Sequence, residues 1–152
     1  METEGLTPVE QDRRDAIAAM TAGEKQRATW FAGVRRILDI AEPHPLLGRP
    51  SVAGGWIAFT IPGTGAEARR CMAAAETLLA AALHASFTGR PDESGYYYVL
   101  EAPLPGGLKV QVRAWREAVA EEHVTCTCGG GTEWVRLPAD EPVPAAAGTG
   151  AA

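Results

Sequence analysis

The segment Leu108-Lys109-Val110-Gln111-Val112-Arg113-Ala114-Trp115 alternates apolar and polar side chains along its length. Successive side chains of a β-strand point to opposite faces of a sheet. One face of this strand would therefore be apolar, with Leu108, Val110, Val112 and Ala114. The other face would carry Lys109, Gln111 and Arg113. Because a register slip of one residue would exchange the two faces, the pattern predicts a strand with one buried side and one polar side.

Turn-rich segments on both sides of this strand predict an antiparallel meander. Residues 96–102 form the preceding strand, between loops rich in Gly and Pro at 89–95 and 103–107. Residues 85–88 open a further short strand. Beyond the central strand, residues 124–137 contain three consecutive glycines between two β-prone runs, which predicts a C-terminal hairpin.

Two helices are predicted before the first strand. Thr7-Pro8-Val9-Glu10 has the residues of an N-cap, a first-turn proline and a capping box, and we expect a helix to about Met20. Thr21-Ala22-Gly23-Glu24 repeats the capping-box pattern and predicts a second helix to about Glu42. Prolines at 43, 45 and 50 then end helical structure.

A strand and a third helix connect these helices to the meander. Trp56–Ile61 predicts a strand that ends at Pro62 and Gly63, and an alanine-rich helix follows from about Gly65 to His84. This order predicts an α+β fold with two N-terminal helices, then a strand, a helix, an antiparallel β-meander and a C-terminal hairpin.

The length of the chain and the distribution of its charges predict one domain with acidic ends. The chain has 152 residues and a net charge of −5. We expect a flexible acidic N-terminus at 1–6, one domain at 7–137 and a disordered Ala/Pro/Gly tail at 138–152. Residues 13–116 carry thirteen Lys or Arg against nine Asp or Glu, so the centre is only mildly basic. This balance argues against strong non-specific binding of nucleic acid.

The character of the first residues, the length of the apolar runs and the number of cysteines predict a cytoplasmic protein. The first five residues are acidic and polar, unlike a secretory signal, and no apolar run approaches the ~20 residues of a membrane span. Three cysteines are few and odd in number, which is typical of free thiols in a reducing compartment. We therefore expect no contact with a membrane.

The segment Phe31–Pro50 resembles the opening of a group of small uncharacterised proteins from actinobacterial genomes and their phages. The likeness continues in Trp115–Glu121 and in a hairpin that ends in Glu133-Trp134-Val135, and it covers about residues 28–137. Two features depart from the group, because Ala120 stands where Cys is frequent and the hairpin is shorter. The resemblance implies the same order of strand, helix and meander and the same genomic setting, and it implies no activity.

The segment Ile61–Arg70 joins a strand to a helix through a glycine-rich turn, an arrangement whose free backbone N–H groups bind anions. In a candidate anion site, Gly65 would lie at the start of the helix, and Arg69 and Arg70 would add positive charge. The alternative is a capping box at 64–67 with no ligand. The segment matches neither a P-loop nor a full dinucleotide-binding motif.

The second candidate site is a polar sheet face formed by Tyr97, Lys109, Gln111 and Arg113. Aromatic rings beside cations suit single-stranded nucleic acid, and the same residue types suit a protein interface. If the register of strand pairing allows it, the pair Tyr96 and Tyr98 would join the basic residues in place of Tyr97. The other alternative is an ordinary amphipathic sheet, with Tyr96 and Tyr98 in the core.

Cys126 and Cys128 are weak candidates for metal ligands. A strand would place them on one face, about 6.5–7 Å apart. A closed zinc site takes four ligands, and no second cysteine pair exists, so we expect buried thiols and no metal. No nucleophile-elbow motif is present, and we expect neither a cofactor nor a catalytic residue.

These patterns favour an accessory or phage-derived regulatory factor that binds another macromolecule, with protein favoured over nucleic acid as the partner. One alternative is an enzyme or ligand-binding protein that uses an anion-binding strand, turn and helix at 62–70. The other is an accessory protein that binds single-stranded nucleic acid. The identity of the partner and the oligomeric state stay open, with a homo-oligomer among the alternatives.

The two-sided strand predicts opposite effects for substitutions at neighbouring positions. Val112→Asp should prevent folding, because it buries an unpaired carboxylate in an apolar layer. Lys109→Glu and Arg113→Glu should fold normally, because both change a solvated face. Circular dichroism and thermal unfolding measure all three variants. An equal loss of structure in the three would contradict the assignment of the faces.

Overall fold

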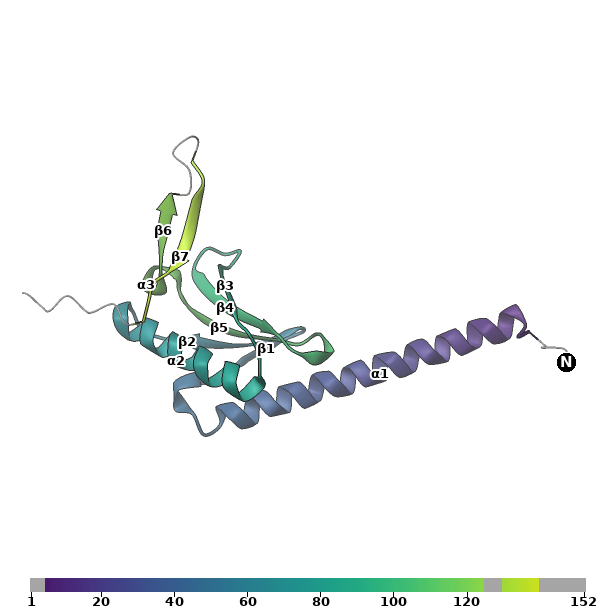
Figure 1. The fold of residues 1–152 in the computed structure, drawn as a ribbon. Coiled ribbons are helices and arrows are strands. Elements are labelled where there is room, and N and C mark those ends of the chain that lie inside the picture. The colour runs from purple at the N-terminus through teal and green to yellow at the C-terminus, as the bar shows by residue number, and fades with distance from the viewer. Residues whose placement is uncertain (1–4, 125–129, 140–152) are drawn as a thin grey trace, which may run out of the picture.

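The computed structural model describes residues 5–124 and 130–139. It is a mixed α+β structure with a helix-rich N-terminal part, a five-stranded sheet and a two-stranded hairpin (Figure 1). The helices are α1 (Pro8–Ala41), α2 (Gly65–Leu83) and the short α3 (Arg116–Val119). The sheet contains β1 (Ser51–Ala53), β2 (Trp56–Ile61), β3 (Thr88–Pro91), β4 (Tyr97–Pro103) and β5 (Lys109–Trp115). The remaining elements are the hairpin strands β6 (Ala120–Val124) and β7 (Thr132–Arg136) and the 3-10 turns η1 (Pro45–Leu47) and η2 (Pro105–Gly107).

Strand β5 lies at the centre of the sheet, whose order is β1-β2-β5-β4-β3. It pairs antiparallel with β4, as the predicted meander requires, and parallel with β2. The register sets Val112 opposite Phe59 of β2 and opposite Leu100 of β4. Three apolar side chains therefore form one row across the middle of the sheet.

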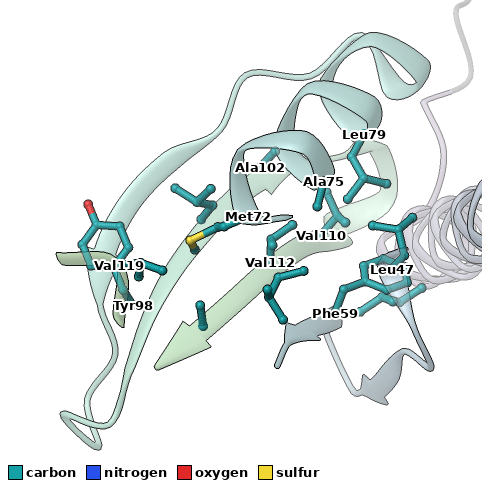
Figure 2. Close-up of a cluster of buried hydrophobic side chains, with 14 of the residues drawn as sticks. Leu47, Phe59, Met72, Ala75, Leu79, Tyr98, Ala102, Val110, Val112 and Val119 are labelled. Carbon is teal, nitrogen blue, oxygen red and sulfur yellow. The ribbon is translucent and has the colours of Figure 1, made fainter. Parts of the chain in front are cut away.

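The apolar side of β5 packs against α2, as the alternation predicts. Val110 and Val112 are fully buried, at 0% exposure. Figure 2 shows the side chains that α2 contributes to this layer, Met72, Ala75 and Leu79. Burial of each large apolar side chain contributes about 1.5–3 kcal/mol, so this layer between helix and sheet supplies much of the driving force for folding.

The two expected N-terminal helices form one continuous helix, α1, of 34 residues. The predicted capping box is present: the Thr7 N–H donates to the Glu10 carboxylate at 2.9 Å, and the Glu10 N–H donates to the Thr7 hydroxyl at 3.3 Å. The second box does not form, because the Thr21 hydroxyl donates to the Ile17 carbonyl at 2.9 Å, inside the helix. Gly23 stays helical, at a cost of about 1 kcal/mol relative to alanine.

The C-terminal part of α1 packs against the domain, whereas residues 5–29 are exposed. Ile37 is fully buried in the core. Nearer the N-terminus, η2 approaches the helix backbone so closely that a Cβ at Gly106 would lie 2.8 Å from the Trp30 amide nitrogen. Beyond this contact α1 extends away from the sheet (Figure 1).

The two edge strands differ from the sequence prediction: the sequence predicts no strand at Ser51–Ala53, and the short strand expected at 85–88 lies instead at Thr88–Pro91, largely within the predicted loop. Strand β3 begins at Thr88 and runs through a Gly-Arg-Pro stretch, and β1 has only three residues. Neither segment shows alternation, because short edge strands carry few core side chains. A Cβ at Gly89 of β3 would lie 2.5 Å from the Tyr98 hydroxyl, so this edge strand packs tightly on the tyrosine.

Several expectations concern the ends of the chain and the tip of the hairpin. The hairpin is present, and its first strand begins at Ala120, earlier than expected. Most of the predicted flexible ends, at 1–4 and 140–152, lie outside the described residues. Residues 125–129 also lie outside them. In the part of the chain that the structure describes, no helix combines the length and the apolar character of a membrane span.

Gly106→Ala should loosen α1 from the sheet. The added methyl would strike the Trp30 amide nitrogen, and a φ of +82° disfavours alanine. We expect the free energy of unfolding to fall by about 1–3 kcal/mol, measured by urea denaturation. Gly107→Ala is the matched control, since its φ is +76° but its Cβ would meet only the end of the Gln26 side chain, at 3.5 Å. An equal loss in both variants would contradict the close approach of η2 to α1.

Candidate functional site

The face of the sheet turned away from α2 is polar and aromatic. The buried residues of α1, η1 and α2 belong to the core on the opposite side, so these elements leave this face uncovered. Alternation and register bring side chains of four neighbouring strands together on it. We call it the open face, and it consists of Trp56, Thr60, Arg90, Tyr97, Glu101, Lys109, Gln111, Arg113 and Trp115, arranged around the buried apolar residues Ala58 and Val99.

A chain of polar contacts crosses the centre of the open face. Arg113 donates two hydrogen bonds to the side-chain oxygen of Gln111, at 3.1 and 2.8 Å, and Gln111 donates to Glu101 at 2.5 Å. The Glu101 carboxylate also lies 3.5 Å from the charged nitrogens of Lys109 and Arg90. These contacts hold long side chains in one arrangement, so the surface is ordered before any partner binds.

The buried position of Gln111 corrects the expectation of a fully solvated face. Its residue exposure is 6%. Because its oxygen accepts from Arg113 and its amide donates to Glu101, burial leaves the side chain paired. These contacts also change the prediction for Arg113→Glu. The variant would place a carboxylate against the Gln111 oxygen, so we expect it to lower the stability of the fold.

Aromatic rings mark both ends of the central strand. The Arg113 guanidinium lies 4.3 Å from the centre of the Trp56 ring, a cation–π contact. At the other end, the rings of Tyr97 and Trp115 stack with their centres 4.9 Å apart and an interplanar angle of 17°. Trp56 pairs with Lys109 at the start of β5, so about 20 Å of strand separates the two aromatic groups.

Glu101 is the one carboxylate of the open face, against three cations. Burial opposes its ionisation, but the hydrogen bond from Gln111 and the charges of Lys109 and Arg90 together lower the pKa of Glu101 below its ordinary value. The carboxylate is therefore ionised at neutral pH. Three cations against one anion give the open face a charge of +2, while the whole chain carries −5.

The structure places all the predicted residues of the sheet face on the open face: Tyr97, Lys109, Gln111 and Arg113. Sequence reasoning missed Trp56, Glu101 and Trp115. Alternation within each strand could have assigned their side, but only the pairing of β2 and β4 with β5 brings them together. Tyr98 is buried as expected, whereas Tyr96 is 68% exposed and lies outside the core.

The predicted strand, turn and helix at 62–70 are present, but the expected capping box is not. The Thr64 side chain makes no capping hydrogen bond to the start of α2. Gly63 and Gly65 have φ angles of +94° and +63°, which glycine adopts without strain. The turn is therefore shaped by its glycines and not by a threonine cap.

The three predicted anion-site residues differ in their relation to the hollow at the start of α2. Gly65 lines a surface hollow of about 790 Å³ that lies between the start of α2 and the end of β5. Arg116 and Glu117 also line it, and Arg69 and Arg70 are not among its lining residues. The carboxylate of Glu117 would repel an anion in this hollow, and an anion site that uses Arg69 and Arg70 stays a prediction.

The candidate metal ligands Cys126 and Cys128 lie outside the described residues. Within residues 5–124 and 130–139, no group of three His, Cys, Asp or Glu side chains could hold a metal ion. His123 lies 2.6 Å from the Glu121 carboxylate, and Cys71 is a free, half-buried thiol that packs against the core.

Comparison with known proteins provides no relative from which a function could be transferred. No protein-family model, no curated protein and no solved structure matches the chain. The open face is therefore the strongest basis for a functional hypothesis.

Glu101→Gln should weaken the fold at neutral pH and not at acid pH. The lowered pKa means that ionised Glu101 stabilises the folded chain above the ordinary pKa of 4.5, and that this stability is lost as the pH falls through the lower pKa of the folded state. We expect a loss of about 1 kcal/mol at pH 7 that shrinks toward zero in acid, measured by urea unfolding. A double-mutant cycle with Lys109→Gln isolates the ion pair, and equal losses at both pH values would contradict its role.

Proposed function

We propose that this chain is a macromolecule-binding accessory protein and that its open face binds another protein. The observation that carries the proposal is the gathering of Trp56, Tyr97, Arg113 and Trp115 on three adjacent strands. Trp, Tyr and Arg dominate the energetic centres of protein interfaces. Strands and paired side chains hold these groups in place, so binding orders few new rotamers and keeps more of its free energy.

The charge of the open face favours a partner with an acidic surface. Arg90, Lys109 and Arg113 outnumber Glu101, and complementary charge speeds association and disfavours basic competitors. The acidic character of the whole chain, at −5, opposes the approach of a phosphate backbone. The charge of the open face suits either kind of acidic partner, and the net charge of the whole chain favours a protein over a nucleic acid.

Single-stranded nucleic acid is the second candidate, and the position of the rings favours it. Trp56 and the Tyr97–Trp115 stack flank a strand that carries Lys109 and Arg113, and nucleic-acid-binding sheets combine aromatic platforms with cations in this way. Against it, Arg113 already covers one face of Trp56, and the other two rings cover each other. Fewer ring faces are then available for bases.

The proposed setting follows from the resemblance over residues 28–137. It supports an origin in actinobacteria or their phages and implies no activity. The cytoplasm is the proposed compartment, because the cysteines are few and odd in number. An enzyme receives less support, because the hollow beside Gly65 combines Arg116 with an opposing Glu117 and lacks the predicted arginine pair.

Site-specific photocrosslinking tests the protein-binding face. A photoreactive side chain replaces Thr60, which is exposed on the open face, or Ala81, which is exposed on α2. In nuclease-treated lysate of the native host, we expect one protein to crosslink from position 60 and not from position 81. Trp115→Ala should reduce that yield at least about tenfold, because central aromatic residues contribute 2 kcal/mol or more to interfaces.

Tyr96→Ala is the matched control, because this exposed ring lines the same hollow as Trp115 but is not one of the residues that define the open face. It should leave the crosslink unchanged. A crosslinked species that disappears with nuclease would move the assignment to nucleic acid. Equal crosslinking from positions 60 and 81, or none from position 60, would contradict the proposal.

A further inference from the structure

Before its contact with η2 near Gln26 and Trp30, α1 is a long helix without a packing partner among the described residues. Residues 8–29 are exposed, and Figure 1 shows this part of α1 extending away from the sheet. Most helical stability in proteins comes from packing of an apolar face and not from the helix alone. A helix with apolar residues outside the domain therefore gains stability from a second surface.

One stripe of exposed side chains runs along this part of the chain. Its members follow one another at alternating steps of four and three positions: Leu6, Glu10, Arg13, Ile17, Met20, Glu24, Arg27 and Phe31. This is the spacing of core positions in a coiled coil. All of them are exposed, and the apolar members keep 41–68% of their surface open to solvent.

Contacts within the chain show that the stripe lies on one side of the helix. Its first four members, from Leu6 to Ile17, line one shallow hollow of about 280 Å³, and the Arg27 guanidinium lies 5.2 Å from the centre of the Phe31 ring. The domain contacts α1 mainly at other positions, since Gly106 approaches Trp30 and Leu108 approaches Gly33. Among the stripe residues, Arg27 also lines a hollow between α1 and the domain, together with Gly106 and Gly107. The stripe is therefore accessible to a second helix.

The stripe is self-complementary about its midpoint, which lies between Ala18 and Ala19. The positions at equal distances from that midpoint are Ile17 and Met20, Arg13 and Glu24, Glu10 and Arg27, and Leu6 and Phe31. Two of these pairs are apolar and two carry opposite charges. When two identical helices pack antiparallel about this point, each residue lies opposite its counterpart, so every layer of the contact is matched.

We propose that two copies of this chain pair through the stripe as an antiparallel coiled coil. Ile17 and Met20 would form the central apolar layers, and Leu6 and Phe31 the outer ones. Between them, Arg13 of each copy would face Glu24 of the other, and Glu10 would face Arg27. The contact is closed by two-fold symmetry, which is the commonest arrangement of homodimers.

The charges select the antiparallel orientation. A parallel pair would set Arg13 against Arg13 and Glu24 against Glu24, and like charges at facing positions destabilise helix pairs. Small residues around the midpoint also favour a second helix, because they let two axes approach to about 8–10 Å. These residues are Ala16, Ala18, Ala19, Ala22 and Gly23.

Sedimentation velocity on the full chain, over a series of concentrations, tests the pairing. The wild type should show a monomer–dimer equilibrium. Arg13→Glu alone and Glu24→Arg alone should each raise the dissociation constant at least about tenfold, because each sets like charges opposite one another. The double variant with both changes restores opposite charges and should recover most of the dimer. Arg14→Glu is the control, since it makes the same charge change next to the stripe.

Disulfide trapping tests the orientation. Chains with Arg13→Cys and chains with Glu24→Cys, mixed and oxidised, should form the mixed disulfide, located by peptide mapping. Neither variant alone should form a disulfide between its introduced cysteines, because these would lie about 16 Å apart along an antiparallel pair.

Three results would overturn the proposal. A monomer at every concentration would mean that the stripe serves a different partner. Failure of the double charge exchange to recover the dimer would mean that the chain dimerises elsewhere. A disulfide formed by Arg13→Cys alone would mean a parallel pair. None of these variants touches the open face, so the crosslink from position 60 reports on the proposed function independently.

Discussion

The alternation of apolar and polar side chains in β5 is the constraint on which the rest of the structure depends. Because β5 is the central strand, its register determines which side chains of β2 and β4 lie beside each of its own. Its apolar row faces α2 and forms the core, and its polar row organises the open face. A slip of one residue would bury Lys109 and Arg113 together, so the core itself enforces the arrangement of the open face.

The open face shows how a polar surface becomes rigid on a small domain. Gln111 is buried at the centre, which requires partners for both ends of its amide group. Arg113 and Glu101 supply them, and the same two residues extend the contacts to Trp56 on one side and to Lys109 and Arg90 on the other. The hydrogen bonds that make burial of the amide tolerable thus also hold the aromatic and charged groups in position for a partner.

The long helix follows a different principle. Its C-terminal part is held by Ile37 in the core and by the close approach of η2 at Gly106, whereas its N-terminal part contributes little to the core. A helix of this kind presents a surface that the domain does not need for folding. Two chains joined through it would carry two open faces at opposite ends of the pair, and a bivalent molecule binds a repetitive or dimeric partner more tightly than either face does alone.

Local patterns in the sequence determined the helix start at Thr7, the helix after Gly65, and the two faces of β5 with Lys109 and Arg113 on the polar one. Each of these features depends on residues within one turn of helix or one pleat of strand, so spacing alone reveals it. The tertiary structure decided the parallel pairing of β2 with β5, the contact of Trp56 with Arg113, the burial of Gln111 and the edge strands β1 and β3. It also joined the two predicted N-terminal helices and left Thr64 without a capping bond. These outcomes depend on contacts between residues far apart in the chain, or on a choice between two local hydrogen bonds of similar strength, and no spacing rule distinguishes them.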